Sequence, residues 1–296
     1  MDIYAAVTDR IIAELEKGNI PWNKPWSGGA AKAIRRSNGR PYSLINQMLL
    51  GKPGEYLTYN QCQKEGGKIK KGAKSKMVVF WKWLQKDKTD SDGNLVRDDN
   101  GLPVIERIPM LRYFNVFHID DCEGLEPKYV QDKAPATAEP VERAEEVIKD
   151  YAGRAKLRID HSEQDEAYYS PSRHLVSLPL MEQFETTAGY YETAFHELVH
   201  STGHKSLLNR FNVESGVAAF GSDSYSKEEL VAEIGACGIM YEMALETEQS
   251  FRNNAAYIQN WLGALKNDKR LIVSAAGRAE KAMKLILNSE DEPEEE

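Results

Sequence analysis

The sequence predicts an α+β protein with two domains, followed by a short acidic tail. The chain has 296 residues, which is long for one domain and comfortable for two. Residues 127–140 contain three prolines and few large apolar side chains, so they are the predicted linker between domains of residues 1–126 and 141–288. Residues 289–296 hold six acidic side chains around one proline, which predicts a disordered tail.

Helical patterns open the first predicted domain, and its sheet comes late. Apolar residues at helical spacing predict helices over residues 2–17, 42–51 and 58–67. Thr58 fits the N-cap of the third helix. Aromatic and β-branched residues at 76–84 and 104–119 predict a two-stranded hairpin, because turn-forming residues fill the gap between them.

The second predicted domain is mainly helical. Two short strands are expected within residues 167–179, on either side of a Ser-Pro-Ser turn. Apolar periodicity predicts helices over residues 140–155, 186–204, 226–245, 253–268 and 271–287.

Composition indicates a cytoplasmic protein without a membrane span. No apolar run approaches the roughly 18 residues that a span requires, and the N-terminus lacks the basic-then-apolar layout of a secretory signal. Cys62, Cys122 and Cys237 are odd in number and far apart. This spacing argues against a disulfide framework and against a zinc site built from thiolates.

Charge is distributed unevenly along the chain, although its net value is −8. Residues 1–86 hold 16 lysines and arginines against 6 acidic residues. Cations that contact phosphates and aromatic rings that stack on unpaired bases are together typical of proteins that bind single-stranded nucleic acid. The candidate contact residues are Arg35, Arg36, Arg40, Tyr42, Lys68, Lys70, Lys71, Lys74, Trp22, Trp26 and Trp81.

A structural alternative applies to these residues, in which the tryptophans form core and the lysines lie in a solvated loop. Trp81 and Trp83 fall on one face of their predicted strand and Phe80 falls on the other. We therefore expect at least one of these two sets to be buried.

The segment FHELVHSTGH contains the clearest chemical motif. His196 and His200 are four residues apart, so a helix presents both imidazoles on one face, and Glu197 reaches the same cleft from the side. This HExxH spacing predicts a zinc site. A catalytic zinc takes three protein ligands and keeps one position for water, so a third ligand must come from elsewhere.

Two patterns compete for the third ligand. In metzincins it is a histidine at a position that is Ser206 here, and His204 comes two residues early, about 12 Å from His196 on an unbroken helix. In gluzincins it is a glutamate on a second helix, which favours Glu229. Glu233, one turn later, is then the carboxylate that orients a ligating histidine, or the ligand in an alternative register.

Glu229 and His204 each have a second interpretation. Ser226 and Glu229 also fit a capping box, in which the glutamate bonds only the backbone at a helix start. His204 is either a substrate or outer contact of the site, or a helix C-terminal histidine that the helix dipole favours.

The motif predicts metal-assisted hydrolysis. Zinc lowers the pKa of a bound water towards about 7, and Glu197 takes the proton as general base and passes it to the leaving group. Tyr225 is a further candidate, for stabilising an oxyanion. Manganese or another divalent ion is an alternative to zinc, because availability as well as affinity decides which metal binds.

Together these motifs resemble the ArdC-type antirestriction proteins of conjugative plasmids. The resemblance covers essentially the whole chain. It is seen in residues 2–26, 42–51, 56–75 and 114–120, then in HELVHSTGH and SKEELVAE further on. It implies an N-terminal domain that binds single-stranded DNA, a related form of which occurs in plasmid primases. It also implies a C-terminal zincin-like metallopeptidase domain.

The resemblance implies protection of incoming plasmid DNA from type I restriction during conjugation. It assigns the metal to His196, His200 and a glutamate of EELVAE, with Glu197 as the base. Three functions remain open at this point. In the first, both domains act and the peptidase cleaves a restriction-system or DNA-bound protein. In the second, the protein is a DNA-binding shield with a structural metal. In the third, it is a metallopeptidase whose basic part recognises an acidic partner.

Overall fold

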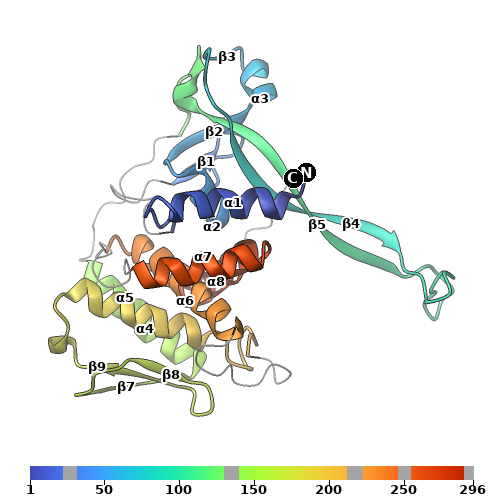
Figure 1. Ribbon diagram of the computed structural model, residues 1–296. Helices are drawn as coiled ribbons and strands as arrows, with labels where there is room; N and C mark the ends of the chain where they lie inside the picture. The colour runs from blue at the N-terminus through green and yellow to red at the C-terminus, as the bar shows by residue number, and fades with distance from the viewer. Residues whose placement is uncertain (23–31, 130–139, 212–222, 246–254, 290–296) are drawn as a thin grey trace.

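The protein combines an α+β part and a mainly helical part, which confirms the predicted fold class (Figure 1). Some predicted features lie outside the part of the chain that the structure describes: Trp26, residues 130–139 of the predicted linker and residues 290–296 of the predicted tail. No helix that is described has both the length and the apolar character needed to cross a membrane. The computed structural model describes residues 1–22, 32–129, 140–211, 223–245 and 255–289.

A four-stranded sheet is the centre of the N-terminal part. β1 pairs with β2 in parallel, whereas the other two pairings are antiparallel. The sheet begins earlier in the chain than the hairpin pattern indicates, because the two added strands are too short to show a period of two. In spatial order the strands are β1 (Ala33–Arg35), β2 (Gly54–Thr58), β5 (Ile105–His118) and β4 (Lys76–Asp87).

The helices of this part follow signals in the sequence. The second ends at Gly51, whose positive φ of 62° is a conformation that glycine adopts without steric cost. The third begins with a reciprocal capping box between Thr58 and Gln61. The remaining elements of this part are α1 (Ile3–Leu15), α2 (Leu44–Leu50), α3 (Tyr59–Lys64), the 3-10 turn η1 (Ile119–Asp121), and a small sheet of β3 (Lys68–Ile69) with β6 (Cys122–Glu123).

β4 and β5 project from the body as a two-stranded arm (Figure 1). They stay paired as far as Asp87 opposite Ile105, whereas β2 pairs only with the end of β5 nearest the body. Trp81 is 40% exposed and Trp83 is 59% exposed on one face, and Phe114 is 54% exposed on the other. Phe80, on the same face as Phe114, is only partly buried, so the expectation that one of the two sets is buried is wrong. Helix α1 reaches this hairpin only at its inner end, where the Tyr4 ring lies 6.4 Å from the Trp81 ring, and no third layer covers the outer part (Figure 1).

The C-terminal part contains a small sheet and a bundle of helices. β9 lies between β7, to which it is parallel, and β8, to which it is antiparallel. The predicted strand pair is therefore present, and β7 is an addition to it. In chain order the elements are α4 (Pro140–Ala155), β7 (Arg158–Ser162), β8 (Tyr168–Ser170), β9 (Leu175–Pro179), η2 (Met181–Gln183), α5 (Thr187–Ser201), α6 (Asp223–Glu242), α7 (Ala255–Asn267) and α8 (Leu271–Leu287).

One hydrophobic core runs through both parts. Val7 and Ile11 of α1 belong to the same buried cluster as Leu265 of α7 and Ile272 of α8. Polar contacts reinforce this junction, since the Thr8 hydroxyl donates to the Lys269 carbonyl at 2.7 Å. The two sequence regions are thus held against each other by packing as well as by the chain that joins them.

Two predicted DNA contacts are wrong, because the side chains are buried. Trp22 is 1% exposed, and its ring packs edge-on against Trp261 of α7 with centroids 5.1 Å apart. Arg36 is 3% exposed; its guanidinium pairs with Glu55 and donates to Glu65 at 2.9 Å. A buried ring has no face for a base, and a buried guanidinium that is already paired has no donor for a phosphate.

Candidate metal centre and nucleic-acid interface

Helix α5 presents the two histidines of the HELVH motif as the sequence predicts. The helix begins after Thr186, whose hydroxyl oxygen accepts from the Gly189 N–H at 3.1 Å. One helical turn separates His196 from His200, and their Nε2 atoms lie 3.1 Å apart. Both rings are largely buried at the junction with α6.

Helix α6 brings Glu229 to the same point. Its carboxylate oxygens lie 3.5 Å from His196 Nε2 and 3.3 Å from His200 Nε2. Ligand atoms bound tetrahedrally at roughly 2.0–2.1 Å are about 3.3 Å from each other. The three separations therefore have the dimensions of one face of a tetrahedral metal site, with room for a fourth ligand beyond it.

The other ring nitrogens of the two histidines face further carboxylates. His196 Nδ1 is 3.8 Å from Glu233, and His200 Nδ1 is 3.6 Å from Glu228. A carboxylate at Nδ1 fixes the ring orientation and leaves Nε2 free for a metal. Glu233 thus lies near His196 Nδ1 and not among the three ligand atoms. This position agrees with the predicted register in which Glu229 is the ligand and Glu233 orients a histidine.

Glu228 and Arg210 are members of the site that the sequence did not reveal. The Arg210 guanidinium donates to Glu228 at 2.6 Å and also to the Thr202 hydroxyl at 2.6 Å and the Val199 carbonyl at 2.7 Å. Arg210 therefore ties the end of α5 to the start of the described part of α6. Its partners are distant in sequence and it lies in an irregular segment, so no periodic pattern indicates it.

Electrostatics at this centre favour a cation. Burial alone would lower the pKa of His200, but hydrogen bonds to Glu228 and Glu229 outweigh it and raise that pKa to about 10. Burial likewise opposes ionisation of Glu229, yet hydrogen bonds from His196 and His200 hold its pKa well below the usual range. The cluster therefore keeps its carboxylates ionised and draws a positive charge onto an imidazole. A divalent cation would replace that proton.

Glu197 follows His196 on α5 and is 8% exposed. Its charge is among those that raise the pKa of His200, which places its carboxylate beside the three-residue group. A carboxylate at this position has the proximity that a general base requires.

His204 does not join the group, and the predicted helix over residues 186–204 is too long. Helix α5 ends at Ser201, and the His204 ring then stacks on His174 with centroids 4.0 Å apart. Its Nδ1 atom lies 2.7 Å from the Ser206 hydroxyl.

The capping-box interpretation of Glu229 does not fit the structure. Helix α6 begins at Asp223, three residues before the predicted start, so Ser226 lies inside the helix and not at its N-cap. The side chain of Tyr225 lies outside the described residues.

A second buried group lies behind His196. Atoms of Glu192, Glu233 and Cys237 that could ligate a metal lie within 4.8 Å of one another. Glu192 is one turn before His196 on α5, and the other two residues are one turn apart on α6. Glu233 links this group to the first one, because its carboxylate also lies 3.8 Å from His196 Nδ1.

The remaining predicted DNA contacts fall in two surface regions and on the arm. Arg35, Arg40 and Tyr42 line a pocket between the two parts of the protein. Trp81 is on the arm. The exposed lysines around β3 and the turn before β4 are Lys68, Lys70, Lys71 and Lys74. Trp83 and Phe114 are the more exposed aromatic residues of the arm, and sequence reasoning did not single out Phe114.

Comparison with known proteins follows the two-part organisation. Residues 1–117 match the N-terminal domain of anti-restriction factor ArdC, and residues 142–278 match a zincin-like metallopeptidase family. The metal-free crystal structure of the antirestriction ArdC protein from plasmid R388 shares 34% sequence identity with the chain and superimposes with a TM-score of 0.72. That match covers 98% of this chain and 100% of the ArdC chain.

The chain belongs to the ArdC family of antirestriction proteins. The Mn(II)-bound structure of R388 ArdC matches at 33% identity over 97% of this chain and 98% of that one, with a TM-score of 0.71. The protein y4eC of Sinorhizobium fredii is 30% identical, over 94% of this chain and 89% of its own length. Family membership confirms the resemblance seen in the sequence.

Two DNA primases named TraC, both from Escherichia coli, are also similar. They are 34% and 35% identical over 99% and 96% of this chain. The chain spans only 20% and 27% of the length of these primases. The shared region is thus a module that occurs both in ArdC proteins and within larger proteins.

Zinc or manganese binding depends on Glu229 more than on His204 if the three-residue group is the site. We expect Glu229→Ala to lower zinc affinity by more than the roughly 10- to 100-fold that loss of an outer partner costs. His204→Ala should bind zinc like the wild type. Competition with a chelating dye measures both affinities, and equal affinities for wild type and Glu229→Ala would contradict the assignment.

Proposed function

We propose that the C-terminal part holds a divalent metal and hydrolyses a peptide bond. The observation that carries this proposal is the set of separations of 3.1, 3.3 and 3.5 Å among His196, His200 and Glu229, beside the carboxylate of Glu197. The donor set of two imidazoles and one carboxylate is that of hydrolytic zinc enzymes. Zinc is the first candidate, and manganese is the second because R388 ArdC is known with Mn(II) bound.

The residues of the site have distinct tasks in this proposal. When bound, the metal supplies Lewis-acid chemistry, which polarises a carbonyl and acidifies water. His196, His200 and Glu229 hold it, while Glu233 and Glu228 orient the two imidazoles through Nδ1. Glu197 accepts a proton from the attacking water and delivers it to the leaving amine.

We infer that the N-terminal part binds single-stranded DNA along the arm and the adjacent lysines. Trp81 and Trp83 are exposed on one face of the arm, and Phe114 is exposed on the other, where it stacks on Phe80 at 4.8 Å. Arg112 lies opposite Phe80 and is exposed. Exposed rings next to cations suit unpaired bases and their phosphates.

We propose that the two activities together protect incoming plasmid DNA from type I restriction during conjugation. Membership of the ArdC family supports this role. In this proposal the DNA brings the metal centre to a restriction-system or DNA-bound protein, which is the substrate.

Glu197→Gln separates a hydrolytic mechanism from a DNA-binding shield. The substitution keeps the size of a largely buried side chain but removes the base, so hydrolysis should fall by about 10²- to 10⁴-fold. Metal and DNA affinity should remain unchanged. Plasmid transfer into a recipient with type I restriction is the measurement: protection should be lost, and full protection by the variant would favour the shield.

DNA binding through the arm predicts a loss of affinity when an exposed ring is removed. Trp83→Ala should weaken binding of a fluorescent oligothymidine about tenfold, because base–aromatic stacking contributes roughly 1–3 kcal/mol per base. Tyr168→Ala is the matched control, because Tyr168 is a 40% exposed ring in the C-terminal part. Anisotropy titrations at several salt concentrations should also show affinity falling steeply with salt. Equal affinity of the two variants would place the DNA elsewhere.

A further inference from the structure

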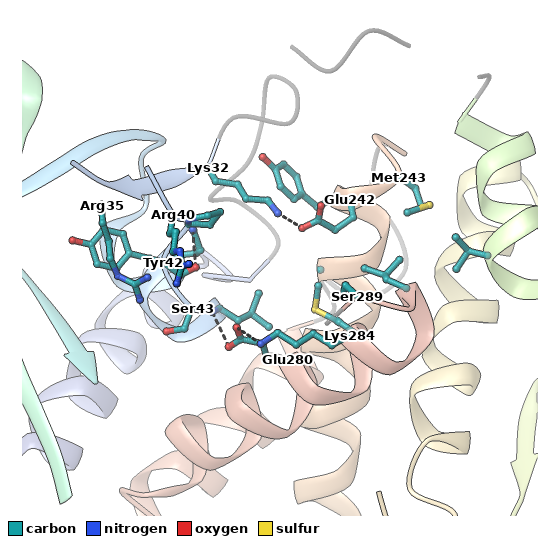
Figure 2. A pocket seen from close by; sticks show the side chains of 18 of the residues that line it. Lys32, Arg35, Arg40, Tyr42, Ser43, Glu242, Met243, Glu280, Lys284 and Ser289 are labelled. Carbon is teal, nitrogen blue, oxygen red and sulfur yellow. Dashed lines mark hydrogen bonds and ion pairs between the residues drawn. The ribbon is translucent and has the colours of Figure 1, made fainter. Parts of the chain in front are cut away.

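A pocket of about 460 Å³ lies where the N-terminal part meets the helical bundle. The segment from β1 to α2 forms one wall, and α4, α6 and α8 form the other. Figure 2 shows Arg35, Arg40 and Tyr42 on the first wall, opposite Glu280 and Lys284 of α8. Its volume is within the range of about 300–1,000 Å³ that is typical of small-molecule sites.

Positive charge dominates the lining of this pocket. Five lysines and arginines line it against two glutamates, and each glutamate already has a lysine partner. Lys32 pairs with Glu242, and Lys284 lies 3.7 Å from Glu280 (Figure 2). The arginines are therefore the cations that set the field inside the pocket.

Two of these arginines are available to an anion. Within the described part of the chain, neither Arg35 nor Arg143 forms an ion pair with a carboxylate. The Arg35 guanidinium lies over the Tyr42 ring, 5.1 Å from its centroid, and Arg143 is exposed at the start of α4. Arginine side chains in such a position donate paired hydrogen bonds to a phosphate.

The rest of the lining suits a planar, largely apolar group. Leu44 and Met283 line the pocket and are buried, whereas Tyr42 and Tyr241 line it and are partly exposed. Burial raises the pKa of Tyr42 to about 12, so its ring stays neutral and keeps its hydroxyl proton. Tyrosine faces and apolar side chains are the surfaces on which nucleic-acid bases stack.

We propose that this pocket binds one nucleotide, with its phosphate held by Arg35 and Arg143 and its base against the tyrosines and the apolar side chains of the lining. The proposal rests on the proposed DNA-binding function and extends it into the C-terminal part, because Arg143 and Tyr241 belong to α4 and α6. The nucleotide comes either from the end of a DNA strand or from free solution. Helix α6 carries pocket residues at its C-terminal end and the metal-facing Glu229 nearer its start.

Charge reversal on α4 tests the proposal without disturbing the core. Arg143 and Lys149 are both exposed on this helix, and only Arg143 lines the pocket, so Lys149→Glu is the matched control for Arg143→Glu. Calorimetry with thymidine monophosphate and with thymidine measures the contribution of the phosphate. Anisotropy with 5′-phosphorylated and 5′-hydroxyl oligothymidine measures DNA.

We expect the monophosphate to bind at least tenfold more tightly than thymidine, because the phosphate makes charge-assisted hydrogen bonds. Arg143→Glu should reduce that affinity about tenfold or more, and Lys149→Glu should leave it unchanged. A matching loss with the phosphorylated oligonucleotide assigns the pocket to a DNA end. A loss with the monophosphate alone assigns it to a free nucleotide.

The proposal is overturned if Arg143→Glu binds both probes as well as Lys149→Glu does. If the oligonucleotide then still responds to Trp83→Ala, the proposed DNA-binding function stands and only the pocket assignment fails. Absence of any oligonucleotide binding by the wild type would instead remove the DNA-binding function itself.

Discussion

The close packing of α5 against α6 is the contact on which the rest of the structure depends. A side chain added at Gly235 would place its Cβ 2.9 Å from Val199 Cγ2, so only glycine lets the two helices approach this closely. At this separation His196 and His200 of α5 meet Glu229 of α6. This three-residue group is thus a consequence of a helix–helix contact that involves Val199, the residue before His200, and Gly235, further along α6 than Glu229.

The same helix pair connects the metal centre with the rest of the molecule. Helix α6 packs on α8, and α8 in turn packs on α2 of the N-terminal part. The C-terminal end of α6 lines the pocket between the two parts, while residues nearer its start supply carboxylates to the histidines. The protein therefore has a continuous core between its proposed DNA-binding surface and its proposed catalytic centre.

Sequence spacing predicted which side chains of the HELVH and EELVAE segments lie together better than it predicted which N-terminal side chains are exposed. HELVH and EELVAE have fixed helical geometry, so the relative positions of His196, His200 and Glu229 follow once the two helices are known to pack. The prediction that Trp22 and Arg36 contact DNA is wrong, because composition does not distinguish a core tryptophan or a buried ion pair from a surface contact. Burial depends on which elements pack together.

The arm and the outer contacts of the site depend on long-range structure in the same way. The sequence predicted the β4–β5 hairpin but not that its outer part leaves the body. The pattern of the hairpin does not show whether other elements pack beside it. Arg210 and Glu228 meet only after an irregular segment returns to α5, as Val199 and Thr202 accept hydrogen bonds from Arg210. Such contacts have no period in the sequence.

X-ray absorption spectroscopy of the zinc-loaded protein tests the central claim most directly, because it identifies the atoms bound to the metal. The account predicts nitrogen and oxygen neighbours at roughly 2.0–2.1 Å, with the multiple scattering of two imidazoles from His196 and His200. A sulfur neighbour at roughly 2.3 Å would contradict it, since Cys237 with Glu192 and Glu233 would then hold the metal. A third imidazole would contradict it equally, because it would replace Glu229.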